Sequence, residues 1–245
     1  MGIRYLAWLG LLWVAALSAQ EVRIPIDNYP PWKIVEGNEI RGGVDLVLTT
    51  ALLDKLGLRP KYVIAPWKRG LQYLETGEVD LVSGIIRNPE REVYLSFFSF
   101  PYKDWSNKVF LVRRGEGGKF SRLADFEGKL VATLRGARHF SEFDQNQKIL
   151  RYDVNSEESA LAMLTLGRVD AAIMSLENGR YYLARQPEMK SSLEYAKYVY
   201  REKVEVFFAI SRRSPLLARQ AELETALRKM IANGEVARIF DQLPH

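Results

Sequence analysis

Two segments of the chain share one pattern of leucines, a glycine and an aspartate. The pattern LxxLxxGxVD reads LQYLETGEVD at residues 71–80 and LAMLTLGRVD at residues 161–170. Leucines three positions apart lie on one face of a helix, and Gly77 and Gly167 suit the left-handed residue that ends one. An apolar run follows each copy, as expected of a buried strand. The repeat predicts either two lobes of the same construction or two helix–strand joins of one α/β domain.

The first half of the chain alternates predicted strands with predicted helices. Its prolines place a turn at DNYPPW, because proline removes a backbone donor and restricts the residue before it. The strands are expected at residues 21–26, 60–65 and 79–84, and the helices at 44–57 and 67–76. This order predicts a parallel sheet with helices on its faces.

The second half repeats this alternation. Strands are predicted at residues 108–115, 129–136, 149–154 and 169–175, with helices starting near residue 138 and at Ser156. The apolar run at 204–211 is expected to close this second sheet. Ser214 and Pro215 then start a helix that runs to Gly234, and a short last helix follows. No flexible linker separates the halves, so strands or short loops should join them and act as a hinge.

Composition narrows the function. The 245 residues are 47 % apolar and 27 % charged, which is ordinary for a globular protein, and the net charge of +5 is too small to indicate a nucleic-acid partner. The absence of cysteine excludes disulfides and thiol nucleophiles. The two histidines, His139 and His245, leave little for a zinc site or a serine–histidine triad. We expect no metal and no cofactor.

The first nineteen residues are typical of a secretory signal. Arg4 precedes the apolar stretch LAWLGLLWVAAL, which is short for a membrane span, and small residues lead to a predicted cleavage after Ala19. The alternative is an uncleaved anchor. An exported chain without cysteine fits a bacterial periplasm.

Three segments resemble the bacterial family 3 extracellular solute-binding proteins, the periplasmic amino-acid receptors of ABC transporters. They are YPPW at 29–32, GIIRNPEREVYLSFFSFPY at 84–102 and the last helices from RRSPLLARQ onward. The resemblance implies an α/β, two-lobed periplasmic-binding-protein-like fold (type II), each lobe a sheet flanked by helices, with two crossing connections. Lobe 1 would be residues 20–107 plus 213–245, and lobe 2 residues 108–212, after a signal peptide at 1–19. The resemblance also implies a monomer with two partners, a small ligand carrying a carboxylate and an inner-membrane ABC permease.

The resemblance also implies which residues bind the ligand. Arg91 occupies the position whose guanidinium forks onto a carboxylate; the alternative is a surface arginine paired with Glu90 or Glu92. Tyr29 and Trp67 occupy positions of aromatic walls, or are core residues instead. Further candidates are Asn88 as a donor and the turn at Gly136 as an anion site beside a helix start. Arg138 follows this turn and either adds a second positive charge or faces solvent. Arg69 is a candidate to face the cleft.

One departure from the family concerns the ligand's ammonium group. Ser175 stands where amino-acid receptors commonly have an aspartate. Glu177 is the nearby candidate to replace that charge, unless it only favours the start of a helix. The main hypothesis is a non-enzymatic solute-binding protein that captures a small polar ligand, an amino acid or a related carboxylate, in the cleft between the lobes and delivers it to an ABC permease. The alternatives are an enzyme similar to cyclohexadienyl dehydratase, with Glu177 as its acid, and a ligand sensor for a membrane kinase.

Overall fold

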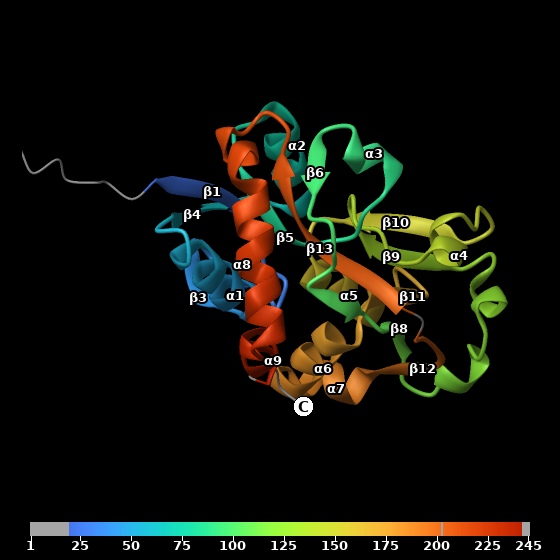
Figure 1. Ribbon diagram of the computed structural model, residues 1–245. Coiled ribbons are helices and arrows are strands. Elements are labelled where there is room, and N and C mark those ends of the chain that lie inside the picture. Colours follow the sequence, from blue (N-terminus) through green and yellow to red (C-terminus); the bar gives the residue numbers. More distant parts are fainter. Residues whose placement is uncertain (1–19, 202, 242–245) are drawn as a thin grey trace, which may run out of the picture.

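The computed structural model describes residues 20–201 and 203–241, so the predicted signal segment and His245 lie outside it. Two α/β halves lie side by side (Figure 1). In the first half β1 (Glu21–Ile26) pairs in parallel with β4 (Arg59–Ile64), and β2 (Ile34–Glu36) forms a hairpin with β3 (Glu39–Gly42). The other elements of this half are α1 (Val44–Asp54), α2 (Trp67–Thr76), β5 (Leu81–Ile85), α3 (Pro89–Glu92), β6 (Leu95–Phe97) and, after the 3₁₀ turn η3 (Pro215–Arg219), α8 (Gln220–Ala232) and α9 (Glu235–Phe240).

The second half is a five-stranded sheet in the order β10-β9-β11-β8-β12. Its central strands β9 and β11 are parallel, whereas β8 runs antiparallel to both β11 and β12. The strands are β8 (Lys108–Arg113), β9 (Leu130–Leu134), β10 (Leu150–Val154), β11 (Ala171–Ser175) and β12 (Leu193–Tyr200). Its helical segments are η1 (Gly117–Lys119), η2 (Leu123–Phe126), α4 (Ser141–Asp144), α5 (Glu157–Thr165), α6 (Leu176–Arg185) and α7 (Pro187–Ser192).

Two neighbouring strands connect the halves. The chain leaves the first half through β7 (Lys103–Trp105) and returns through β13 (Lys203–Ser211), and the two pair with each other. The later part of β13 pairs with β5 and β6, so the prediction that this strand closes the second sheet is wrong. Its apolar residues Phe208 and Ile210 are fully buried in the first core, and an all-apolar run cannot indicate which sheet receives it. The division of the chain into lobes at residues 108 and 212 stays a prediction.

The sequence repeat has the same local structure in both halves. Helix α2 ends at Gly77 (φ 81°) and α5 ends beside Gly167 (φ 69°), both left-handed. The Asp80 N–H donates to the Arg23 carbonyl, and the Arg23 N–H returns a bond to the Asp80 carboxylate, both at 2.8 Å. Asp170 exchanges the equivalent bonds with Leu130, at 2.8 and 2.9 Å. Each aspartate therefore fastens its helix–strand join to the neighbouring strand.

The two aspartates provide a matched test of this fastening. Asp80 is buried and also accepts bonds from the Arg23 guanidinium and from Ser214, which outweigh the effect of burial and lower the pKa of the Asp80 carboxyl. We expect Asp80→Asn to lower the free energy of unfolding by about 1–3 kcal/mol. Asp170, whose side chain is 39 % exposed, should lose less than about 1 kcal/mol on the same change.

Urea unfolding of the two variants measures both losses, and equal losses would contradict this interpretation. Because the pKa of Asp80 is lowered, its contribution should be fully present above the ordinary carboxyl pKa of 3.8 and should disappear as pH falls through the folded value. The difference in the free energy of unfolding between Asp80→Asn and the unaltered protein should therefore disappear at acidic pH.

Candidate functional site

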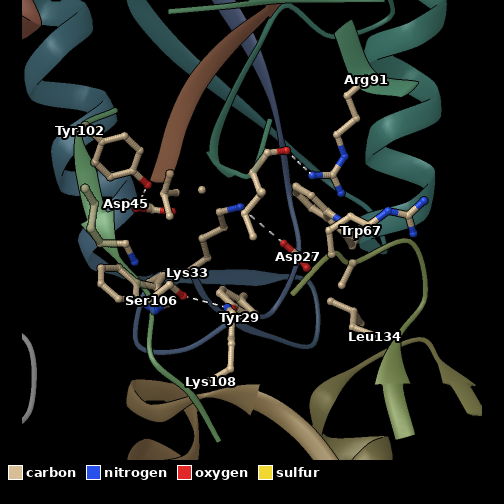
Figure 2. Close-up of a pocket in the computed structure, with 17 residues that line it drawn as sticks. Asp27, Tyr29, Lys33, Asp45, Trp67, Arg91, Tyr102, Ser106, Lys108 and Leu134 are labelled. Atoms are coloured by element: carbon tan, nitrogen blue, oxygen red, sulfur yellow. Dashed lines mark hydrogen bonds and ion pairs between the residues drawn. The ribbon is translucent and has the colours of Figure 1, made fainter. Parts of the chain in front are cut away.

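A cavity lies where the two halves meet, and charged and aromatic side chains line it (Figure 2). Four of the nine predicted site residues line the cavity: Tyr29, Trp67, Arg91 and Arg138. The other five lie outside the lining: Arg69, Asn88, Gly136, Ser175 and Glu177. The cavity volume is about 70 Å³, which corresponds to a handful of water molecules and therefore to a small ligand.

Arg91 is buried at 5 % exposure and is not the surface arginine of the alternative hypothesis. Its guanidinium donates to two backbone carbonyls, that of Ile86 at 2.6 Å and that of Gly136 at 3.0 Å. Burial lowers the pKa of Arg91 to about 10, so the group is still charged at neutral pH. Within the described residues it forms no ion pair, because Glu90 pairs with Arg138 and Glu92 with Arg87.

Local sequence places Arg91 in the cavity. Asn88 is the N-cap of the short helix α3, and its Oδ1 accepts the Arg91 N–H at 2.9 Å, with Pro89 at the first helical position. Asn88 thus holds the helix that carries Arg91, and its own Nδ2 is buried without a hydrogen-bond partner among the residues described.

The turn after β9 contacts the first half at Arg91 and Trp67. The carbonyl of Gly136 accepts from Trp67 Nε1 at 3.3 Å as well as from Arg91, and Gly136 has a left-handed φ of 80°. Arg138 reaches across to Glu90 at 2.6 Å. The helix expected from residue 138 begins only at Ser141 and is four residues long, so it provides no helical N-terminus at this turn.

A buried lysine, which the sequence did not reveal, occupies the centre of the cavity. Lys33 is 5 % exposed, its Nζ lies 3.7 Å from the Asp27 carboxylate, and it donates to the Ser83 carbonyl at 3.4 Å. The same Nζ is 5.3 Å from the centre of the Trp67 ring. A lysine just after a proline turn normally predicts a solvated side chain, so no pattern pointed to it.

Two further lysines and a serine line the side of the cavity opposite Arg91 and Trp67 (Figure 2). Lys103 is 7 % exposed and lies over the rings of Trp32 and Trp105, at 3.5 and 4.8 Å. Lys108 is 4 % exposed and donates to Ser106 Oγ at 2.8 Å. Burial lowers the pKa of both lysines to about 8. The sequence offered one sign of Lys108, which begins an otherwise apolar strand. A lysine in that position must face either water or a polar partner, so it was a candidate for the cavity.

Comparison with known proteins identifies the family. Residues 22–243 match the model of the bacterial extracellular solute-binding proteins, family 3. The chain belongs to this family. Among the helices of the described residues, none has the length and apolar character needed to cross a membrane.

The relatives of this solute-binding chain are distant. The virulence sensor protein BvgS of Bordetella pertussis is 24 % identical over 237 residues, which are 94 % of this chain but only 18 % of that protein. A periplasmic binding protein of Salmonella typhimurium with high arginine specificity has a TM-score of 0.77 at 20 % identity, with 92 % and 99 % of the two chains covered. An ancestral amino-acid-binding protein, described as a precursor of cyclohexadienyl dehydratase, has a TM-score of 0.74 at 22 % identity, with 91 % and 95 % covered. These likenesses establish the two-lobed α/β fold, and the halves are called lobes below.

The carboxylates near the cavity of this solute-binding chain already have partners. Asp27 pairs with Lys33, and Asp45 accepts the Tyr102 hydroxyl at 3.0 Å. Ser175 is 2 % exposed and caps α6 by accepting the Asn178 N–H at 3.3 Å. Of the two carboxylates on the lining, Asp27 therefore has a cationic partner, whereas Asp45 accepts only a neutral hydroxyl.

Glu177 tests whether an ammonium is recognised at all. It lies in the first turn of α6, 9 % exposed and off the lining, and its Oε2 has no hydrogen-bond partner among the described residues. We expect Glu177→Gln to change the affinity ratio of an amino acid to the same acid without its amino group by less than about twofold, because a group off the lining cannot contact the ammonium. Calorimetry on L-norvaline and pentanoate measures the ratio, with Glu188→Gln on α7 as control. Selective weakening of norvaline by tenfold or more would instead make Glu177 the ammonium partner.

Proposed function

We propose that this chain captures a small molecule through its carboxylate, in the cavity between the lobes, and performs no chemistry on it. The supporting observation is Arg91, a buried guanidinium that lies over the Trp67 ring and whose hydrogen bonds in the described chain go to backbone carbonyls. Burying a charge without a counter-charge costs free energy, and a carboxylate supplies both the charge and two acceptors in matching geometry. The class of ligand is an amino acid or a related carboxylate.

Lobe closure provides the means of capture. Arg91 and Trp67 of the first lobe bond to Gly136 of the second, and Asn28 Nδ2 donates to Glu158 at 2.7 Å across the same boundary. A ligand carboxylate on Arg91 would take donors that now point at the Gly136 carbonyl. Binding and the relative position of the lobes are thereby coupled, with β7 and β13 as the hinge.

The lining disfavours a cationic ligand such as the arginine bound by one of the structural relatives. In this chain Lys33 already fills the space between the Asp27 carboxylate and the Trp67 ring. These two groups are the kind that would hold a guanidinium or ammonium, and an internal lysine competes for both.

The family and the first residues support a proposal for the setting of the protein. We propose a monomer exported to the periplasm behind a cleaved signal at residues 1–19, which presents its closed form to an ABC permease. A second candidate is a sensing module, because a protein named as a virulence sensor matches 94 % of this chain. The same closure of the lobes on a ligand would serve either transport or sensing.

An enzyme on this fold is a weaker candidate. The acid expected of a dehydratase here was a carboxyl group, Glu177, on the cavity beside the bound anion. Glu177 lies off the lining, and so does Glu157, whose pKa is raised to about 8 by burial and whose Oε2 accepts from Asn178 at 2.7 Å.

Removing the guanidinium tests the proposal. Arg91→Ala should weaken carboxylate binding by about 2–5 kcal/mol, because it leaves the acid buried without its partner. Arg91→Lys should bind poorly as well, since one ammonium cannot replace two parallel donors. Calorimetry with the tightest acid from a thermal-shift screen of amino and organic acids measures both losses. The exposed Arg41 of the β2–β3 hairpin, changed to alanine, is the control. Near-native affinity in Arg91→Ala would refute the carboxylate anchor.

A further inference from the structure

The segment that leaves the first lobe turns its polar side chains into the cavity. Lys103 opens β7, Lys108 opens β8, and Ser106 lies between them; all three line the cavity and are at most 7 % exposed. The intervening Asp104 points away, with its side chain 61 % exposed beside Lys203. Because Lys103 and Ser106–Lys108 belong to the connection itself, a ligand that they hold contacts the hinge directly.

Neither lysine has an anionic partner in the described part of the chain. Lys103 Nζ lies over two indole rings, and Lys108 Nζ donates to a neutral serine hydroxyl. Rings and hydroxyls soften the cost of burying an ammonium but do not neutralise it. Their pKa values of about 8, set by burial and partly restored by nearby carboxylates, leave both mainly protonated at pH 7.

The carboxylates around these lysines act at a distance and mostly have other bonds. Asp45 of α1 accepts from Tyr102, Glu157 of α5 from Asn178, and Asp144 of α4 from the His139 N–H at 3.0 Å. Glu177 of α6 lies off the lining, and its field raises the pKa of both lysines without an ion pair. An added anion would therefore meet two ammonium groups that form no ion pair with any residue of the described chain.

We infer that Lys103, Ser106 and Lys108 form a second anion subsite, opposite Arg91, and that the ligand is a small acid with two negatively charged groups. Figure 2 shows Arg91 and Trp67 on one side of the cavity and Ser106 and Lys108 on the other, so the two acidic groups would lie at opposite ends of one molecule. The inference rests on the proposed function, in which Arg91 holds the first carboxylate.

The charges of the lining agree with a doubly charged ligand. Lys33 is matched by Asp27, and Arg138 by Glu90. Of the other charged groups on the lining, Arg91, Lys103 and Lys108 remain against Asp45, which leaves an excess of two positive charges. A single carboxylate would neutralise only half of it.

Matched acids that differ only in a terminal methyl or carboxylate test the subsite. The pairs are butanoate with succinate, pentanoate with glutarate, and L-norvaline with L-glutamate. In the unaltered protein the better-fitting diacid should bind at least about tenfold more tightly than its partner. Lys103→Met and Lys108→Met should each weaken that diacid about tenfold and leave the monoacid within about twofold. Lys119→Met, on an exposed lysine, is the control.

A pH series adds an independent readout. The diacid stays ionised while the two lysines lose protons above about pH 8, so its affinity should fall by at least about tenfold from pH 7 to pH 9. Monoacid binding should stay level, because the pKa of Arg91 is about 10.

The outcomes separate this inference from the proposed function. Equal affinity of the two acids within every pair would overturn the second subsite and leave the Arg91 anchor in place. A diacid preference that persists in the double variant Lys103→Met, Lys108→Met would do the same, provided that the variant unfolds at the native temperature. If only diacids bind measurably, the test is whether the lysine variants lose diacid affinity: a loss supports the second subsite, and an unchanged affinity overturns it. Failure of every acid would refute both ideas.

Discussion

Positive charge buried between two lobes is the constraint on which this molecule depends. Arg91, Lys103 and Lys108 are each at most 7 % exposed, and none has an ion pair in the part of the chain that the structure describes. Such groups lower stability unless something compensates their desolvation. Backbone carbonyls, indole rings and a hydroxyl provide part of that compensation here. What they leave uncompensated is available to stabilise a bound anion.

The rest of the fold holds these charges in place. Asp80 and Asp170 bond the same helix–strand join to the neighbouring strand in each lobe. Asn88 caps the helix that carries Arg91, and the connection through β7 carries the lysines. Lys33 lies at the centre and neutralises Asp27, one of the two carboxylates on the lining. In the proposed function, this internal lysine disfavours cationic ligands.

Much of the fold could be predicted from the sequence, because periodic patterns of apolar residues indicate its helices and strands. The repeat at 71–80 and 161–170, the helix at 67–76 and the strand at 21–26 all follow from apolar spacing and glycine stops. The membership of β13 did not follow, because pairing partners are chosen by tertiary packing. The motif around Arg91 predicted that it faces the cleft, and its burial on the lining agrees with this. Its role as ligand anchor stays a prediction.

The lysines of the cavity were missed for a physical reason. A lysine in a loop or at a strand end is usually solvated, whereas Lys103 is buried and lies over the rings of Trp32 and Trp105. The positions of Ser175, Glu177 and Arg69 depended on side-chain direction, which family spacing does not determine. Ser175 became a helix cap, Glu177 lies off the lining, and Arg69 is exposed on α2.

The most direct test of the central claim is a crystal structure of the protein with the tightest-binding acid. A carboxylate should lie against the Arg91 guanidinium with both oxygens within hydrogen-bond distance, in the place where the Gly136 carbonyl now accepts. A ligand bound elsewhere, with Arg91 still bonded only to the carbonyls of Ile86 and Gly136, would contradict the claim that buried positive charge makes the site.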